Sequence, residues 1–233
     1  MPSVPAVAAA VAAAYRGFSS SIVTDALARF GVGAWMDDVL PVNPAWRVSG
    51  RVRTMCYAPR SGMKHAGHTL YTMAERVEPG DVVILAAAGT RGWLLGENMA
   101  HFCINHRLAG LVTDGRVRDA LELAELPLPI FSAGTSARPS SSEVEVVAVD
   151  VPVRCAGAYV RPGDFIVGDR DGIVVAPHEA IEALVLEAEE LLVLEKEQEI
   201  AIRDGAPAAA IAEISRRKKV RKGPAFDAVA RKA

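Results

Sequence analysis

The sequence predicts a single domain of the α/β class. In the first 135 residues, amphipathic helix-like segments alternate with short apolar strand-like segments. Residues 143–177 are rich in valine and carry the turn signals RPGD and DRDG, which predicts a run of β-strands. A long amphipathic helix follows, and no internal repeat or long linker divides the chain. We therefore expect one compact α/β domain.

Two helices are expected near the N-terminus, within residues 3–31. The stretch MPSVPAVAAAVAAAYRG is alanine-rich and lacks a basic start. It is too short and too weakly apolar to cross a bilayer, so we interpret it as a packing helix. Serines at 19–21 can cap a second helix, whose apolar residues recur at helical spacing up to Phe30 and which Gly31 ends.

Helices and strands alternate through the middle of the chain. A helix is expected at 68–80 and another begins at 117, whereas strands are expected at 47–59, 81–89, 110–115 and 128–134. The continuously apolar strand at 81–89 is typical of a strand buried on both faces. Residues 91–110 look helical with a break at Gly96. A glycine followed by polar residues suits a helix N-terminus that a ligand approaches closely.

Helices are also expected near the C-terminus. The sequence predicts a long amphipathic helix and a shorter one between residues 178 and 215. The remaining residues, 216–233, begin with the basic cluster RRKKVRK and are expected to form a mobile tail. Contact of this cluster with RNA or an acidic partner is the alternative.

Composition narrows the function classes. The 233 residues carry a net charge of −2 with a pI of about 6.2, so there is no electrostatic case for a nucleic-acid partner. No apolar stretch reaches about 18 residues, so no membrane span is expected. The three cysteines lie far apart without metal-binding spacing, which favours reduced thiols in the cytoplasm.

The candidate reactive groups are Glu97 and the pair Arg118–Asp119. Twenty residues separate Glu97 from Arg118, enough for a strand to return the chain to the same edge of the sheet. Free amides of a helix N-terminus and a guanidinium bind a small carboxylate or enolate. Two carboxylates bind a hard divalent cation, often through water. Together they suit a metal-assisted reaction of a 2-oxo acid, unless Arg118 and Asp119 only cap a helix and pair with surface charges.

Neighbouring polar residues are interpreted more simply. Asp114 and Gly115 are expected to form a tight turn, and Arg116 to face solvent or a neighbouring subunit. His65 and His68 could line the pocket mouth, or bind a metal, although no third ligand is close in sequence. A nucleophilic role for Cys103 would need a base and an orienting partner, so we expect it, with His101 and His106, to serve packing or the surface.

The segments GENMA, AGLVTDGRVRD and RPGDFIVGDRDGIVVAP closely resemble the RraA-like family. The resemblance runs from about Ser20 to the long C-terminal helix. This family includes the class II 4-hydroxy-4-methyl-2-oxoglutarate / 4-carboxy-4-hydroxy-2-oxoadipate aldolases and the regulator of ribonuclease E activity A. The resemblance implies one α/β domain of the swivelling β/β/α type over residues 1–215, with a long C-terminal helix.

The resemblance also implies roles for the candidate residues. Asp119 would be the direct carboxylate ligand of Mg²⁺ or Mn²⁺. Glu97, where the aldolases usually carry aspartate, would contact the metal through water. Arg118 would bind the carboxylate and oxo oxygens of pyruvate and stabilise its enolate. The start of the helix would complete the substrate pocket, with Gly96 and the backbone amides of Asn98 and Met99. Asn98 departs from the family, because an apolar residue is common there in the aldolases.

A further glutamate would come from the C-terminal helix of a neighbouring subunit. Glu195 matches best, through water to the metal, and Glu197 and Glu199 are alternatives. The resemblance thus implies a homotrimer or homohexamer with active sites at subunit interfaces. It implies a 4-hydroxy-2-oxo acid aldolase that also decarboxylates oxaloacetate through a pyruvate enolate. The alternative is a non-catalytic regulator that docks on ribonuclease E or another protein.

Overall fold

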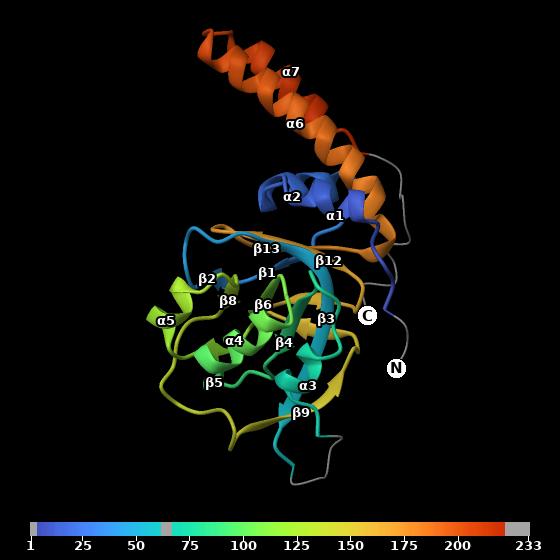
Figure 1. Ribbon diagram of the computed structural model, residues 1–233. Helices are drawn as coiled ribbons and strands as arrows, with labels where there is room; N and C mark the ends of the chain where they lie inside the picture. Colours follow the sequence, from blue (N-terminus) through green and yellow to red (C-terminus); the bar gives the residue numbers. More distant parts are fainter. Residues whose placement is uncertain (1–3, 62–66, 222–233) are drawn as a thin grey trace.

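The computed structural model describes residues 4–61 and 67–221. Figure 1 shows a curved sheet between two groups of helices, with a helical hairpin projecting from one end. The N-terminal helices lie between the sheet and this hairpin. The shorter helices of the middle of the chain cover the other side of the sheet. Within the described residues, no helix is long and apolar enough to cross a membrane.

Seven α-helices and one 3₁₀-helix are found in the described part of the chain. They are α1 (Ala9–Tyr15), α2 (Ser20–Arg29), α3 (Leu70–Ala74), α4 (Glu97–Asn105), α5 (Ala120–Glu125), η1 (His178–Ala180), α6 (Ile181–Arg203) and α7 (Ala208–Lys218).

The strands of the first half are β1 (Trp35–Met36), β2 (Leu40–Pro41), β3 (Val48–Pro59), β4 (Val82–Ala86), β5 (Trp93–Leu95), β6 (Gly110–Thr113), β7 (Arg116–Val117) and β8 (Ile130–Ser132). Those of the second half are β9 (Val144–Val149), β10 (Val153–Cys155), β11 (Ala158–Val160), β12 (Phe165–Asp169) and β13 (Gly172–Ala176).

The main sheet curls round until its two ends nearly meet. Its strand order is β1-β13-β12-β3-β4-β6-β8-β2, and β9 pairs with β3 outside this path. The central strands β3, β4, β6 and β8 run parallel, whereas the flanking pairs are antiparallel. Because β1 and β2 stand at opposite ends of this order and only residues 37–39 join them, the sheet is forced into a barrel-like curve.

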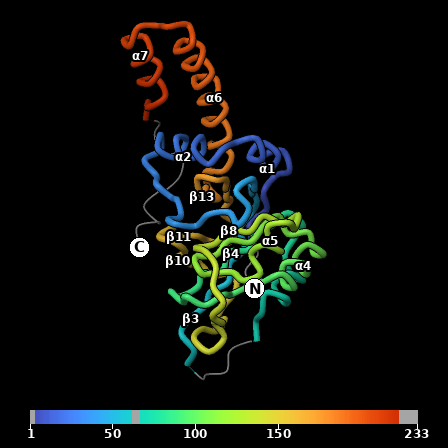
Figure 2. The backbone as a smooth tube through the Cα atoms, turned by 90° about the vertical axis from the view of Figure 1, so that its left-hand side faces the viewer, coloured from blue at the N-terminus to red at the C-terminus, as the bar shows by residue number. Residues whose placement is uncertain are grey.

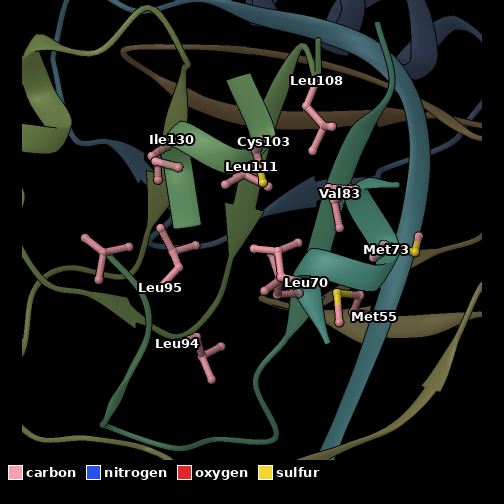
Figure 3. Packing of buried hydrophobic residues seen from close by; sticks show 14 of the residues in the cluster. Met55, Leu70, Met73, Val83, Leu94, Leu95, Cys103, Leu108, Leu111 and Ile130 are labelled. Atoms are coloured by element: carbon pink, nitrogen blue, oxygen red, sulfur yellow. The ribbon is translucent and has the colours of Figure 1, made fainter. Parts of the chain in front are cut away.

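Strand β4 shows how the sheet separates two apolar cores. Val82 and Ile84 pack into a cluster that also contains Val112 from β6. Val83 and Leu85 point the other way because side chains alternate across a strand, and they join the cluster beneath α3 and α4. Figure 3 shows this second cluster, with Leu70 and Cys103 from the two helices close to the strands. The prediction that this strand is buried on both faces is therefore confirmed.

The hairpin of α6 and α7 is fastened to the domain by a buried arginine on α2. Only 1% of the Arg29 side chain is exposed, and its Nη1 lies 2.6 Å from Oε2 of Glu187 on α6. Its Nε donates to the carbonyl of Lys218, at the end of α7, over 3.0 Å. One guanidinium thus joins three helices and satisfies a carbonyl that α7 itself leaves without a donor. Figure 2 shows the hairpin standing above α2.

Two expectations from the sequence are wrong in detail. The helical interpretation of residues 91–110 holds only from Glu97, because Trp93–Leu95 is strand β5, paired in parallel with β7. The basic tail does not begin at residue 216, because α7 continues to Lys218. Its last basic residues pair with acidic side chains, as Arg217 does with Glu197 over 2.6 Å. Residues 222–233 lie outside the described part of the chain.

Candidate active site

A short parallel strand pair brings the two predicted segments together. In the β5–β7 pair, Leu95 stands opposite Val117, and the backbone N–H of Arg118 donates to the Leu95 carbonyl over 3.1 Å. The residues that follow these strands, Gly96–Glu97 and Arg118–Asp119, therefore lie side by side. The prediction that they meet at one edge is confirmed, although the strands that align them form a small sheet of their own.

Asp119 joins the two helix starts. It precedes α5 with φ 57° and ψ 43°, a left-handed conformation that aspartate tolerates better than most residues. Its side chain does not cap α5. Instead, Oδ2 accepts a hydrogen bond from the backbone N–H of Glu97, the first residue of α4, over 3.1 Å. The Asp119 side chain thus lies against the positive N-terminal end of α4.

Gly96 is required by the closeness of these groups. A Cβ at this position would lie 2.4 Å from Oδ2 of Asp119 and 2.9 Å from Nε of Arg118. Its φ of −148° is ordinary extended backbone, so space and not backbone freedom demands glycine here. The groups that approach Gly96 in the structure are the two charged side chains, and its expected close approach by a ligand stays a prediction.

Arg118 is held on two sides and is otherwise open. Its Nε lies 3.4 Å from Oδ2 of Asp119, and its Cζ lies 4.0 Å from the ring centroid of Trp93. About half of the side chain, 48%, is exposed. Within the described residues, Nη1 and Nη2 donate no hydrogen bond to protein. The guanidinium edge is therefore available for an anion.

Glu97 and the helix start complete the cluster. The Glu97 carboxylate is 42% exposed and lies 3.5 Å from Nε2 of His101, one turn further along α4. The amides of Asn98 and Met99 belong to the first turn of α4, where backbone N–H groups have no acceptor within the helix. Asn98 is exposed and Met99 partly so. The site therefore combines carboxylates, one guanidinium and helix-terminal amides.

The chain bends at Asp114–Gly115 before this site, but the side-chain bond within the bend comes from Thr113, whose Oγ1 accepts the N–H of Gly115 over 2.9 Å. The Asp114 carboxylate instead ties two loops together. Its Oδ1 accepts the N–H of Ala87 over 2.7 Å, and its Oδ2 accepts the N–H of Ala156 over 3.2 Å. A Cβ on Gly115 would lie 2.8 Å from the Cβ of Ala87, so the turn needs glycine. Arg116 points away to donate to the Thr135 carbonyl over 3.2 Å.

The other candidates serve packing and the surface. Cys103 is fully buried, and burial raises the pKa of its thiol to about 12, which keeps it protonated and unreactive. His101 is exposed, and His106 stacks on Phe102 with ring centroids 4.6 Å apart. His68 is partly exposed, whereas His65 lies outside the described residues.

The three candidate glutamates of α6 pair within their own chain. Glu195 bonds to Lys218 Nζ, Glu197 to Arg217, and Glu199 to two basic residues of α6, Lys196 and Arg203. The site that Glu195 is expected to complete belongs to a second copy of the chain. Its role there stays a prediction.

The donor set fits a divalent cation bound with few protein ligands. In residues 4–61 and 67–221, no group of three or more His, Cys, Asp or Glu side chains converges as a metal site. Asp119 and Glu97 are oxygen donors of the kind that Mg²⁺ and Mn²⁺ prefer, and Mg²⁺ commonly keeps several waters and uses one or two carboxylates. The side chains of Asp119 and Glu97 are 36% and 42% exposed, so both carboxylates are open to such an ion.

Sequence reasoning missed Trp93. Its ring supports the guanidinium of Arg118, yet Trp93 stands 25 residues before it in a segment that looked helical. The available signal was a single aromatic residue two positions before the Leu95–Gly96 junction. The position of Trp93 becomes informative only once β5 is known to pair with β7.

Comparison with known proteins agrees with this architecture. Residues 20–175 match the family described as RraA-like, Aldolase/RraA. A Halalkalibacterium halodurans protein, named by inference as a 4-hydroxy-4-methyl-2-oxoglutarate aldolase, is 31% identical over 196 residues, which is 83% of this chain and 89% of the relative. The 4-hydroxy-4-methyl-2-oxoglutarate aldolase of Thermus thermophilus is 32% identical over 132 residues, covering 56% of this chain and 76% of that protein.

A solved structure is similar over most of its length. The crystal structure of Streptomyces coelicolor RraAS2, described as an unusual member of the RNase ES inhibitor RraA protein family, superposes with a TM-score of 0.77 at 29% identity. The match covers 84% of this chain and 98% of that one. With its parallel central strands, its cluster at the starts of α4 and α5 and its long C-terminal helix, the chain belongs to the RraA-like Aldolase/RraA family and has its α/β fold.

Proposed function

We propose that the protein is a divalent-metal-dependent carbon–carbon lyase acting on 2-oxo acids. Its reaction would pass through a pyruvate enolate, as in a 4-hydroxy-2-oxo acid aldolase that also decarboxylates oxaloacetate. One observation carries the proposal: Asp119, Arg118 and the N-terminus of α4 meet around Gly96, where a side chain would not fit. Membership of an aldolase family supports the reaction class.

Arg118 is placed to bind the carboxylate of the 2-oxo acid. Its two Nη groups form a planar fork that matches a carboxylate, and the amides of Asn98 and Met99 add donors from the helix start. The same donors can share the negative charge that develops on the enolate oxygen. Binding and stabilisation of the reaction intermediate would therefore use one set of groups.

Asp119 is placed to hold Mg²⁺ or Mn²⁺, with Glu97 contacting the ion through water. When bound, such a cation supplies Lewis-acid polarisation of the 2-oxo oxygen. In an aldol cleavage, the substrate hydroxyl loses its proton, the carbon–carbon bond breaks, and its electron pair passes to the pyruvate enolate. Glu97 can take up that proton through water and return it to the enolate carbon, giving pyruvate. In the decarboxylation of oxaloacetate, the bond to the distal carboxylate breaks, carbon dioxide leaves, and the electron pair passes to the same enolate. No substrate hydroxyl takes part, so the proton that gives pyruvate comes from water.

We propose further that the site is completed in a homotrimer or homohexamer by Glu195 of a neighbouring copy. Exposed apolar side chains recur every seven residues along α6, at Leu186, Val193 and Ile200. A stripe of this kind favours burial against another surface. Light scattering after gel filtration is expected to give the mass of three or six chains, and a monomer would contradict the assembly.

The reaction is tested by pyruvate release from oxaloacetate and from 4-hydroxy-4-methyl-2-oxoglutarate. Rates are measured with Mg²⁺ or Mn²⁺, with and without a chelator, and corrected for the slow metal-catalysed reaction without protein. We expect chelator-sensitive turnover that Arg118→Ala abolishes. Arg116→Ala is the matched control, since Arg116 points to the Thr135 carbonyl and should leave turnover unchanged.

Two results would overturn the proposal. One is an absence of metal-dependent turnover on both substrates, which would favour a binding protein of the regulator type. The other is full activity of Arg118→Ala, because the mechanism leaves no other guanidinium at the site.

A further inference from the structure

The stacking of Trp93 on Arg118 assigns this tryptophan a role in the site. We infer that Trp93 is a positioning residue that presents the guanidinium of Arg118 to a carboxylate ligand. The inference rests on the proposed function for its kinetic consequence, but its geometric content stands on the contacts of the two side chains. The Cζ of Arg118 lies 4.0 Å from the ring centroid of Trp93.

The backbone of Trp93 is paired on both sides. The N–H of Trp93 donates to the carbonyl of Arg138 over 2.8 Å, and Trp93 forms a parallel bridge with Pro139. On the other side, β5 pairs with β7, so Trp93 stands opposite Arg116. The aromatic platform therefore belongs to a strand whose backbone is paired on both edges.

Stacking restricts Arg118 without using its hydrogen-bonding edge. An arginine side chain has several rotatable bonds and is half exposed here, so it would otherwise sample many rotamers. A guanidinium lying on an aromatic ring is attracted through its flat face, while its N–H groups point outward in the plane. Asp119 contacts Nε, which leaves Nη1 and Nη2 without a protein acceptor among the described residues.

The chemical consequence concerns ligand binding and the enolate alike. A guanidinium whose orientation is already fixed loses less conformational entropy on binding a carboxylate than a freely rotating one does. A misaligned fork would also stabilise the enolate less well, because transition-state stabilisation depends on preorganised donors. Removing the platform should thus affect both KM and kcat, without removing any group that touches the substrate.

The kinetic test compares Trp93→Leu, Trp93→Phe and Trp35→Leu. For oxaloacetate with Mg²⁺, we expect Trp93→Leu to lower kcat/KM by about three- to tenfold, the range of a partly exposed cation–π contact, with most of the loss in KM. Trp93→Phe keeps an aromatic face and should recover most of it. Trp35 is 53% exposed on β1, at the end of the sheet order, so Trp35→Leu should behave as wild type.

A spectroscopic readout separates positioning from a general loss of structure. In a ¹H–¹⁵N spectrum of the arginine Nε–Hε region, the Arg118 signal is identified by its absence in Arg118→Lys. The Trp93 ring current should shift this signal upfield. Trp93→Leu should return it towards the other arginines, and Trp93→Phe should keep part of the shift. Pyruvate with Mg²⁺ should move the signal at lower concentration in wild type than in Trp93→Leu.

Each outcome has a defined meaning. An Arg118 signal at the same position in wild type and Trp93→Leu overturns the inference, as do equal kcat/KM values for these two active proteins. If wild type itself shows no metal-dependent turnover, the proposed function fails. The ring-current shift and the pyruvate titration then decide the role of Trp93 on their own.

Discussion

The carboxylate of Asp119 and the backbone amide of Glu97 are joined by a hydrogen bond of 3.1 Å. This bond connects the first residue of α4 to the residue that precedes α5. The group proposed to bind the cation is therefore also the group that fixes the distance between the two helix starts. Substitutions at Gly96 or Asp119 should therefore affect both the proposed cation binding and the local geometry.

Gly96→Ala should remove activity while sparing stability. The added carbon would lie 2.4 Å from Oδ2 of Asp119 and 2.9 Å from two atoms of Arg118, so both charged side chains must move. Displacements of about 1 Å in an active site cost about 100-fold in rate, which is the loss we expect in kcat/KM. The backbone at Gly96 is extended, so the midpoint of urea unfolding should change little.

Gly80→Ala should lower stability and leave activity unchanged, the opposite of Gly96→Ala. Gly80 has φ 93° and no atom within 4 Å of the added carbon, so alanine is strained there without touching the site. We expect a loss of about 1–3 kcal/mol in the free energy of unfolding and normal turnover. A Gly96→Ala protein with the kcat/KM of wild type would refute the crowded geometry around residue 96.

Asp119→Asn should separate charge from shape. Asparagine tolerates the left-handed backbone of position 119, and its carbonyl oxygen can still accept the Glu97 amide. The negative charge that would hold Mg²⁺ or Mn²⁺ is lost. We expect a fall of at least about 100-fold in turnover and a much weaker Mn²⁺-dependent rise in melting temperature, with the metal-free melting temperature nearly unchanged. Retained metal-dependent stabilisation would place the cation elsewhere.

Arg29→Ala should loosen the helical hairpin. It leaves Glu187, whose side chain is 14% exposed, without its closest cation, and it removes a donor from the Lys218 carbonyl at the end of α7. Breaking a buried ion pair costs about 3–5 kcal/mol, which urea unfolding would detect. Hydrogen exchange should accelerate first in α7.

Arg203→Ala provides the comparison. Arg203 also pairs with a glutamate, Glu199, but its side chain is 73% exposed. Exposed pairs contribute about 0–1 kcal/mol, so this variant should unfold almost as wild type does. Equal effects at the two positions would show that burial of Arg29 is not what fastens the hairpin.

Alkaline pH should destabilise the protein through its buried thiols. Burial raises the pKa of Cys103 from about 9 to about 12, so the folded chain holds a proton that the unfolded chain releases. The stabilisation is complete below pH 9 and is lost as pH rises from 9 towards 12, by up to about 1.4 kcal/mol per pH unit for each such thiol. Urea unfolding between pH 7 and 10.5 measures this slope.

Cys103→Ala should flatten that slope even though the smaller side chain lowers stability at every pH. Cys155 is also fully buried, and its pKa is raised chiefly by burial and also by the nearby Asp114, so part of the slope should remain. An unchanged slope in Cys103→Ala would mean that this thiol ionises as readily in the folded chain as in the unfolded chain.

Local patterns in the sequence were sufficient for much of the fold and for the site's three charged groups. The apolar strand β4 and the capped helix α2 can be predicted from their own residues. The meeting of Glu97 with Arg118–Asp119 followed from the return of the chain through a strand. Roles for individual residues came from the family resemblance, since spacing alone could not separate a metal ligand from a helix cap.

Features that depend on distant partners were beyond the sequence. The residues Trp93–Leu95 resemble the start of a helix until β7, which follows more than 20 residues later, supplies a strand partner. The same pairing places Trp93 under Arg118. The left-handed turn at Asp119 is likewise set by the amide of Glu97, and the end of α7 by Arg29. None of these contacts leaves a local signature.

The short link between β1 and β2 has a consequence for synthesis on the ribosome. Trp35 pairs with Val174, and Leu40 pairs with Ser132, so β1 and β2 are both synthesised long before their partner strands. The two end strands of the main sheet are therefore synthesised before its central strands. Strand β1 cannot be paired until Val174, about three quarters of the way along the 233-residue chain, has been translated. Nascent chains stalled between β8 and β13 should therefore be protease-sensitive at residues 35–39, because β2 can already pair with β8 while β1 has no partner.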